Sequence, residues 1–438
     1  MRTKEVSLVS FDGTERESAT LARPERRQDL LDLVARGGTF IPRGAGLSYA
    51  AASMAEGTVS VDMSRLDRLL AFDAETGEVT VEPGVTVGAL TDFLARRGRE
   101  LPVVPGYPDI TVGGCIAFDV HGKSQFHSGN FGRWVLELGL FHPSHGEQSC
   151  GPHAKPDLFA LTLGGMGLTG IITWARLRTA PLQGHAVEVE AVAVDDLTAA
   201  AELMRARAAS VSCTYSWNNL NRRRARFGRG VVYLEKHVEG SAEGGPKRRR
   251  FEIRQRFPLA IWGRPTAAMI LSIYERLARR QSRRRLALRP ALFPIEGLEG
   301  YYAAFGSRGF REYQIIVPFE AWGRFTESLE DLLAKNPAPI TLGSLKLFDG
   351  LGRNLTFCGS GICLAIDVPA TATAARLFIE IDRLAIDLGA CVNLSKDSRI
   401  SAELCRRIFP QYEAFRTALR TYDPEARCMS RLRTRVGV

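Results

Sequence analysis

The chain has 438 residues, 45% of them apolar and 24% charged, which excludes a fibrous or low-complexity protein and exceeds the length of one ordinary core. No run of 18 apolar residues occurs, so the sequence predicts no membrane-spanning helix. The net charge is 58 minus 48, or +10, and this excess favours anionic partners.

The first 180 residues alternate short strands with short helices. Leucines at helical spacing predict a helix over 24–35, and alternating apolar residues predict a strand over 58–63. Turn residues between apolar runs predict hairpins over 72–81 and 136–148. Pro181 marks the end of this part of the chain.

The sequence pattern then changes. Strands are predicted at 187–194, 313–318 and 362–368, and helices at 319–335 and 373–388. Strands that recur at long intervals, with helices between them, predict an α+β domain whose sheet is largely antiparallel.

Two glycine motifs compete as phosphate-binding loops. The glycines of 165–170 have the spacing of a dinucleotide fingerprint, but the next residues, IITWARL, predict a strand where that fingerprint requires a helix. The motif PRGAGLSY at 42–49 contains Gly44 and Gly46, which let successive backbone N–H groups turn inward around an anion beside Arg43. Such a turn is often purely structural, but its place after a strand and ahead of a second glycine-rich stretch favours anion binding.

That second stretch, VGGCIAFDVHGKSQFHSGNFG at 112–132, has no helical or strand period. Its glycines would allow the backbone to approach a planar ligand closely. His121 and Lys123 can both donate hydrogen bonds to such a ligand, whereas His127 has no assigned role.

A metal site is a weaker alternative. His142, His145, Cys150 and His153 have spacings that zinc sites use. They surround a predicted hairpin turn, however, and no second cluster supports them, so we predict no metal site.

Clustered arginines carry much of the positive charge. They lie at 248–250, directly after Lys247, and at 279–280 and 283–285, within an arginine-rich segment, 239–290, that we expect to include a surface loop. Solvated surface, or contact with anionic lipid headgroups or a polyprenyl phosphate, would explain them. Nucleic-acid binding is disfavoured because no matching motif accompanies them.

Cysteine usage and the N-terminus indicate the compartment. None of the eight cysteines forms a CxxC motif, and the charged N-terminal segment has no apolar signal core. We therefore expect reduced thiols in a cytoplasmic protein.

Four motifs together resemble a known family. PRGAGLSY, PGYPDITVGGCIAFDVHGK, GGMGLTGII and LSKDSR, in this order, are similar to the flavin-binding oxidoreductases of the vanillyl-alcohol-oxidase type, which have a PCMH-type FAD-binding domain. Within that superfamily the chain most resembles the decaprenylphosphoryl-ribose 2′-oxidases. The resemblance covers nearly the whole chain and implies an α+β, two-domain fold. An FAD-binding domain, 1–185 plus 391–438, would be split around an inserted substrate domain, 186–390.

The resemblance also implies an FAD site. The superfamily often attaches FAD covalently through a histidine of the first loop, and the matching residue here is Leu47, so we expect non-covalent FAD. The implied cofactor-binding residues are Arg43, Gly44, Ala45, Gly46, Leu47, Ser48, Tyr49, Pro105, Gly106, Thr111, Val112, Gly113, Gly114, Ile116, Ala117, His121, Gly122, Gly167 and Ile172.

The substrate side implied by the resemblance contains Lys123, Gln314, Lys346 and Lys396. Two positions depart from the family. Ala365 stands where the family has a cysteine, with Cys363 two residues away on the same face, and Asn393 stands where it has an aromatic residue.

The reaction implied is oxidation of a secondary alcohol, with hydride transfer to the flavin and loss of the hydroxyl proton. Lys396 and His121 are the candidate catalytic residues. To accept the proton near pH 7, Lys396 would need a pKa about 3 units below its usual value of about 10.4. Otherwise its charge would stabilise the alkoxide. A surface lysine in a salt bridge is the structural alternative.

The implied substrate is the 2′-hydroxyl of a polyprenyl-phosphoryl ribose, oxidised to a 2′-keto sugar. A short-chain NAD(P)H-dependent reductase would then reduce the product, giving net epimerisation to arabinose. Such a lipid substrate predicts peripheral contact with the inner membrane face through the basic segments. The alternatives are an aldonolactone or alditol oxidase of the same fold and, more remotely, a basic nucleic-acid- or membrane-binding protein without enzymatic activity.

Overall fold

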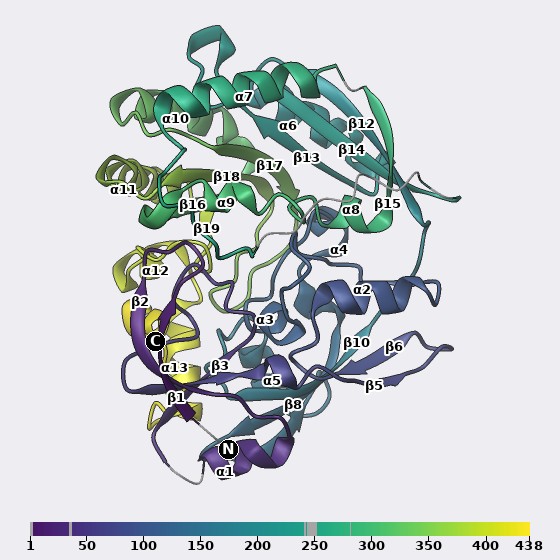
Figure 1. Ribbon diagram of the computed structural model, residues 1–438, viewed down its shortest axis with the longest axis vertical. Helices are drawn as coiled ribbons and strands as arrows, with labels where there is room; N and C mark the ends of the chain where they lie inside the picture. The colour runs from purple at the N-terminus through teal and green to yellow at the C-terminus, as the bar shows by residue number, and fades with distance from the viewer. Residues whose placement is uncertain (1–2, 35–36, 241, 243–251, 281) are drawn as a thin grey trace.

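The computed structural model describes residues 3–34, 37–240, 242, 252–280 and 282–438. The basic run at 247–250 lies outside the described residues. Figure 1 shows the strands of the N-terminal part in the lower half and a large sheet in the upper half. The C-terminal helices, in yellow, return to lie beside β1 and β2.

The lower half contains two main sheets. The four-stranded sheet has the order β1-β2-β4-β3, with β1 and β2 antiparallel and β4 parallel to both β2 and β3. The five-stranded sheet, β5-β6-β10-β8-β9, is antiparallel. The strand bounds are β1 Thr3–Val9, β2 Arg16–Ala22, β3 Thr39–Arg43, β4 Thr58–Asp62, β5 Leu69–Phe72, β6 Glu78–Val81, β8 Val135–His142, β9 Gly146–Cys150 and β10 Ile171–Arg178, and a small sheet pairs β7 Arg99–Glu100 with β11 Ala180–Pro181.

Both predicted hairpins are confirmed, as β5–β6 and β8–β9. The helix predicted over 24–35 is α1, Arg27–Val34. The other helices of this half are α2 Val87–Ala95, α3 Val112–Ala117, α4 Gln125–Ser128 and α5 Pro156–Thr162.

The stretch 112–132 shows no helical period in the sequence, yet it begins with a helix. Its first residues form helix α3, because the hydroxyl of Thr111 accepts a hydrogen bond from the Gly114 amide at 3.3 Å and caps the first turn. Val112 and Ile116 are fully buried on one face of this helix. Their burial outweighs the low helix propensity of the two glycines.

The upper half is one eight-stranded antiparallel sheet in the order β15-β12-β14-β13-β17-β18-β16-β19. The sheet takes its strands from residues 186–392, so the predicted antiparallel character is confirmed. The strand bounds are β12 Ala186–Val194, β13 Cys213–Asn218, β14 Gly230–Val238, β15 Arg283–Ala287, β16 Phe310–Val317, β17 Leu342–Phe348, β18 Gly361–Pro369 and β19 Cys391–Val392.

Helices cover both faces of this sheet (Figure 1). On one face α6, α10 and α11 bury apolar residues against the largest core, and the opposite face carries α7, α8 and α9. The bounds are α6 Leu197–Arg207, α7 Arg264–Ala278, α8 Leu288–Leu292, α9 Gly300–Ala303, α10 Trp322–Lys335 and α11 Ala372–Asp387. Short 3-10 helices occupy Met63–Arg65, Phe131–Trp134, Ala208–Ser210, Arg224–Arg226, Gly306–Arg308 and Phe319–Ala321.

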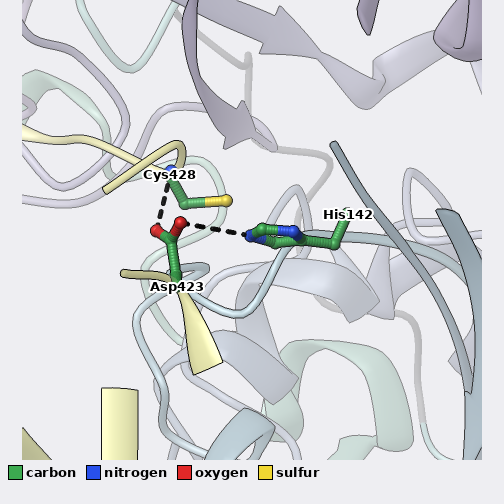
Figure 2. Close-up of side chains that lie close together, drawn as sticks. All are labelled: His142, Asp423 and Cys428. Atoms are coloured by element: carbon green, nitrogen blue, oxygen red, sulfur yellow. Dashed lines mark hydrogen bonds and ion pairs between the residues drawn. The ribbon is translucent and has the colours of Figure 1, made fainter. Parts of the chain in front are cut away.

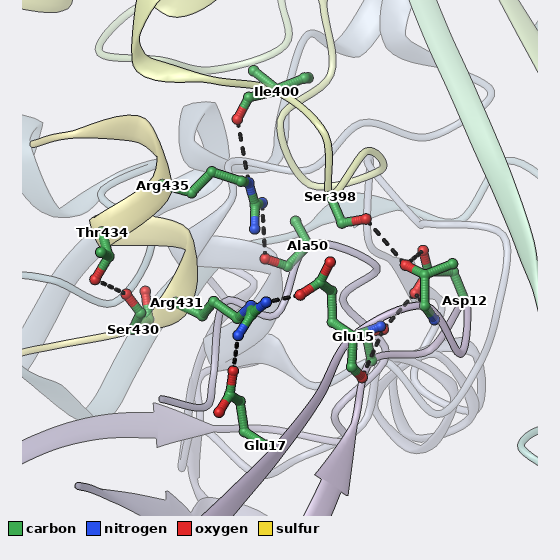
Figure 3. A network of polar contacts seen from close by, with 12 residues as sticks. Asp12, Glu15, Glu17, Ala50, Ser398, Ile400, Ser430, Arg431, Thr434 and Arg435 are labelled. Atoms are coloured by element: carbon green, nitrogen blue, oxygen red, sulfur yellow. Dashed lines mark hydrogen bonds and ion pairs between the residues drawn. The ribbon is translucent and has the colours of Figure 1, made fainter. Parts of the chain in front are cut away.

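The C-terminal tail packs against the N-terminal strands. It contains α12 Ala402–Ile408, α13 Tyr412–Tyr422 and α14 Arg431–Val436. Figure 3 shows Arg431 between the carboxylates of Glu15 and Glu17, and Arg435 donating to the carbonyl of Ala50 at 3.1 Å. These contacts join residues that are 385 to 416 positions apart in the sequence. No helix in the described part of the chain is long and apolar enough to cross a membrane.

Helix α11 offers a test of the core. Phe378 is fully buried between this helix and the sheet, whereas its neighbour Ile379 is 45% exposed. We expect Phe378→Ala to lower the free energy of unfolding by about 3–5 kcal/mol through lost burial and the cavity it leaves. Ile379→Ala should change it by about 0.5 kcal/mol or less. Urea unfolding measures both, and equal effects would contradict the packing described.

Candidate active site

A cavity lies where the first glycine loop, helix α3, the GGMG turn and the start of the C-terminal tail meet. Predicted cofactor residues that line it are Gly44, Ala45, Gly46, Leu47, Ser48, Tyr49, Thr111, Gly113, Gly114, Ala117, Gly167 and Ile172, and Lys396 also lines it.

The glycines of this cavity leave no room for side chains. A Cβ on Gly44 would collide with the Thr111 hydroxyl, and Gly46, at φ +67°, would place one against the guanidinium of Arg43. Gly167 also has a left-handed backbone, at φ +75°. At these glycines the cavity wall is therefore bare backbone, which allows a cofactor to approach closely.

A buried cation lies behind the first loop. Arg43 is 7% exposed, and its guanidinium donates to the Ser53 hydroxyl at 2.8 Å. Burial, and then the charge of Arg254, lowers the pKa of Arg43 to about 10, so it stays charged at neutral pH. Among the described residues no carboxylate forms an ion pair with it. A buried charge without a counter-ion fits a site for the anionic pyrophosphate of FAD.

The remaining predicted cofactor residues do not line the cavity with their side chains. Val112 and Ile116 are buried in the core beneath α3, so they would reach a cofactor only through their backbone. Gly122 packs against the backbone of Val104, where a Cβ would collide. Pro105 and Gly106 belong to the loop that follows Val104.

His121 lies against two aromatic rings, with centroid distances of 4.9 Å to Phe348 and 5.4 Å to Phe357. Burial, and then the charges of Lys346 and Lys396, lowers the pKa of the imidazole well below its usual value. His121 is therefore neutral at pH 7. It can donate or accept one hydrogen bond at each nitrogen, but it is a poor cation for an anionic group.

Lys123 is already paired. Its ammonium donates to both carboxylate oxygens of Glu235, at 2.8 and 2.7 Å, and to the carbonyl of Ala291 at 2.6 Å. It also lies 4.9 Å from the centre of the Tyr215 ring. Because Glu235 neutralises this charge, Lys123 can attract a substrate phosphate only weakly.

Lys346 belongs to β17 and is the cross-strand partner of Tyr215 on β13. No hydrogen bond or ion pair joins its ammonium to another residue that the structure describes. Burial lowers the pKa of Lys346, and the nearby charge of Lys396 adds to that effect. Of the two lysines, Lys346 is thus the one available to a ligand.

Lys396 is held from two sides. Its Nζ lies 3.9 Å from the centre of the Tyr49 ring and 3.3 Å from Oε2 of Glu312. The Tyr49 amide also donates to the carbonyl of Ser395 at 3.2 Å. These contacts join the first glycine loop, strand β16 and the tail around one ammonium group.

Glu312 faces a second carboxyl group. It is the cross-strand partner of Asp367 on β18, and both side chains are buried. Burial, and then the charge of Glu312, raises the pKa of Asp367 well above its usual value, which favours the protonated form of Asp367. Tyr301 donates to Asp367 Oδ2 at 2.8 Å. The pair therefore presents one negative charge to Lys396.

Gln314, on the large sheet, is hydrogen-bonded to Asn393, the residue that stands where the family has an aromatic side chain. The amide of Gln314 donates to Glu312, and its oxygen accepts from Asn393 Nδ2 at 2.7 Å. Ala365 lies opposite Gln314 in the register, and Cys363 lies opposite Lys346. Burial raises the pKa of Cys363 to about 12, so its thiol is unreactive near neutral pH.

Several lining or partner residues were not predicted. Met166 has a positive φ of 58° beside Gly167, and its position within the GGMG run is the local signal that could have marked it. Glu235, Glu312 and Asp367 act through contacts between distant strands, for which the sequence carries no local signal. The other unpredicted lining residues are Ala52, Ser53, Met63, Pro83, Ile110, Phe118, Val120 and Ser395.

The residues whose spacing resembles that of a zinc site, His142, His145, Cys150 and His153, do not converge on one point; His142 and His145 have separate partners in the tail. His142 is buried beside Asp423 and Cys428 of the tail, with its Nε2 3.6 Å from Asp423 Oδ1 (Figure 2). His145 instead donates to the carbonyl of Tyr422 at 2.7 Å. Arg433 already pairs with Asp423 at 2.9 Å, so this group fits a structural tie between β8 and the tail.

Comparison with known proteins identifies the cofactor. Residues 19–151 match the family of the FAD binding domain. This region contains the first glycine loop and helix α3, and residues of both line the cavity. The chain is an FAD-dependent oxidoreductase that acts on CH–OH groups.

Most of the chain is similar to the decaprenylphosphoryl-beta-D-ribose oxidase of Mycolicibacterium smegmatis. The two are 28% identical over 404 residues, which cover 88% of this chain and 86% of that protein. An uncharacterized protein of Streptomyces coelicolor is 28% identical over 380 residues, covering 81% of this chain and all of that protein. The D-arabinono-1,4-lactone oxidase of Yarrowia lipolytica is 31% identical over only 125 residues, covering 28% of this chain and 24% of that protein.

The position of Lys396 predicts a role in the chemical step. We expect Lys396→Ala to retain FAD but to slow flavin reduction by substrate about 100-fold or more, since a positioned charge is lost beside the reacting oxygen. Lys335→Ala, on the exposed side of α10, serves as the matched control. Stopped-flow absorbance measures the rate. A variant that reduces its flavin as fast as the wild type would show that Lys396 has no such role.

The raised pKa of Asp367 predicts that isosteric amide substitutions at Asp367 and Glu312 have unequal effects on the rate of flavin reduction. Asp367→Asn should reduce its flavin within about threefold of the wild-type rate at pH 7, because that carboxyl is already neutral. Glu312→Gln removes the charged partner of Lys396 and should slow reduction by about tenfold or more. Anaerobic single-turnover kinetics compare the two. If Asp367→Asn is the more damaging change, the proton has been assigned to the wrong carboxyl group.

Proposed function

We propose that this protein oxidises the 2′-hydroxyl of a polyprenyl-phosphoryl ribose to the 2′-keto sugar, with FAD bound non-covalently. The main support is the group of His121, Lys346 and Lys396 next to the FAD cavity, which combines a neutral imidazole with two cations. This combination suits a substrate that carries both a sugar hydroxyl, which the imidazole can hydrogen-bond, and a phosphate, which a cation can bind. The long alignment with a decaprenylphosphoryl-beta-D-ribose oxidase supports the same substrate class.

Bound FAD would supply the hydride acceptor. Oxidation removes a hydride from the carbinol carbon and a proton from its hydroxyl oxygen. We propose that Lys396 faces this oxygen and stabilises the negative charge that develops as the proton leaves. His121 orients the hydroxyl through a hydrogen bond, and Lys346 binds the phosphate. The pair of Glu312 and Asp367 holds Lys396 in place.

Arg43 and the first glycine loop would bind the pyrophosphate of FAD, and Gly167 and Ile172 would contact the rest of the cofactor. Leu47, on the cavity wall, has no atom that could bond covalently to the flavin. In this proposal residues 1–185 and 391–438 form the FAD-binding domain, and 186–390 form the substrate domain. The contacts of the tail with Glu15 and Ala50 support that division.

The keto product would be the substrate of a second enzyme, a short-chain NAD(P)H-dependent reductase. We place both steps at the inner face of the membrane, since the substrate is a lipid. An aldonolactone or alditol oxidase is less well supported, because alignments with lactone oxidases cover less than a third of this chain.

Anaerobic bleaching of the bound flavin tests the substrate class. Polyprenyl-phosphoryl ribose should bleach the flavin at least about 100-fold faster than free ribose, alditols or aldonolactones at equal concentration, because only the first compound has a phosphate for Lys346. Lys346→Met should abolish most of this preference while leaving the slow reaction with free sugars. Equal or faster bleaching by a lactone or alditol would refute the proposal and favour the alternative.

A further inference from the structure

Helix α7 is an amphipathic helix whose outer face is apolar and uncovered. Ala267, Leu271 and Ala278 face the sheet, at helical spacing. On the opposite side Met269, Ile273 and Leu277 recur every four residues and are 58%, 50% and 54% exposed. A row of large apolar side chains in water is unfavourable unless a partner covers it.

Basic residues flank this row. Arg264, Arg276 and Arg280 are exposed on the helix and in the turn that ends it. The only acidic residue of the helix, Glu275, is buried and lies 3.9 Å from Arg229. The outer face is therefore apolar and positive.

The helix lies beside the substrate side of the site. The Tyr274 hydroxyl is 2.9 Å from that of Tyr233, and Tyr233, Tyr215 and Lys346 stand side by side on three neighbouring strands. Two strand spacings, about 10 Å, separate Tyr233 from Lys346. Helix α7 therefore packs on the sheet face that also carries Lys346, two strands away from the contact between Tyr274 and Tyr233.

The segment before helix α7 also exposes apolar side chains and contains a basic residue. It leads from Arg254, which donates to the carbonyl of Ala45 in the first glycine loop, to the start of α7. Leu259 and Ile261 in this segment are 80% and 45% exposed. Exposed apolar residues therefore continue from the helix toward the cofactor cavity.

We propose that the outer face of α7, made of Met269, Ile273 and Leu277 with the flanking Arg264, Arg276 and Arg280, docks on an anionic lipid surface. A helix with an apolar row and flanking arginines lies in the plane of the headgroups, with its apolar side chains among the acyl chains and its cations at the phosphates. Charge complementarity favours this occupant over a second copy of the chain, because two such faces would bring like charges together.

The proposal stands on this surface and does not require the substrate proposed above. It does explain how the enzyme could reach a substrate held in a membrane. Because the test vesicles contain no sugar, failure of docking and failure of the substrate assignment give different results.

The experiment is flotation of the FAD-loaded protein with vesicles of phosphatidylcholine alone or mixed with phosphatidylglycerol, followed by the flavin absorbance. We expect binding to the mixed vesicles and little binding to phosphatidylcholine. The triple variant Met269→Ser, Ile273→Ser, Leu277→Ser should bind the mixed vesicles at least about tenfold more weakly. Arg276→Gln with Arg280→Gln should also weaken binding about tenfold and reduce its salt dependence.

The matched controls are Ile379→Ser and Arg376→Gln on α11, which covers the other face of the sheet. Both should bind as the wild type does. Unchanged flavin content and thermal unfolding would show that the α7 variants fold. The proposal is overturned if the wild type does not bind mixed vesicles, or if the triple variant binds them like the wild type. It is also overturned if sedimentation velocity shows a wild-type dimer that the triple variant dissociates.

Discussion

The position of one ammonium group depends on three distant parts of the chain. Lys396, at the start of the tail, lies between the Tyr49 ring and the Glu312 carboxylate. Tyr49 belongs to the loop that lines the cofactor cavity, and Glu312 belongs to the large sheet. Any shift of the tail or of the sheet relative to the loop would break one of the two contacts. The geometry of the site is therefore a consequence of how the whole chain packs.

Placing this charge in a partly buried site requires compensation. An isolated ammonium in a low-dielectric interior is strongly unfavourable, and a facing carboxylate offsets that cost only when its other oxygen atoms are also satisfied. Glu312 accepts from Gln314 as well as from Lys396. Asp367 would add a repelling negative charge, but burial and the charge of Glu312 raise its pKa and favour its neutral form. The substrate side thus keeps nearly balanced charge, with Lys346 left as the surplus cation.

Local patterns in the sequence predicted the local structure well. The hairpins at 72–81 and 136–148 carry their own turn residues, and the helix at 319–335 carries its own apolar period, so these elements needed no tertiary information. The first glycine loop was found for the same reason, since its glycines follow a strand directly. Helix α3 was missed because its stability comes from a threonine cap and from burial, which outweigh two glycines.

The ion pairs of the site could not be predicted from local sequence patterns. Lys123 looked like a free cation beside a glycine, but Glu235, more than 100 residues later, neutralises it. Glu312 and Asp367 meet only because β16 and β18 pair in one register, and a slip of one residue would turn both to the other face. Lys396 and Lys346 were identified through the family resemblance, whereas their partners appear only in the assembled sheet.

The tail that carries Lys396 also contains a carboxyl group, Asp423, whose negative charge helps to hold the tail in place. Burial alone would raise the pKa of Asp423, but contacts with His142, Arg433 and the amides of Arg427 and Cys428 outweigh it and lower that pKa well below its usual value. A carboxyl group with a lowered pKa contributes stability at pH values above its unfolded pKa, about 3.9, and that contribution is lost as the pH falls further. Since Asp423 holds the tail to β8 and to Arg433, protonation of this carboxyl group in strong acid would remove a contact that holds the tail. The contacts of Lys396 with Tyr49 and Glu312 depend on that same tail, so its catalytic position and the stability of the C-terminal segment are coupled.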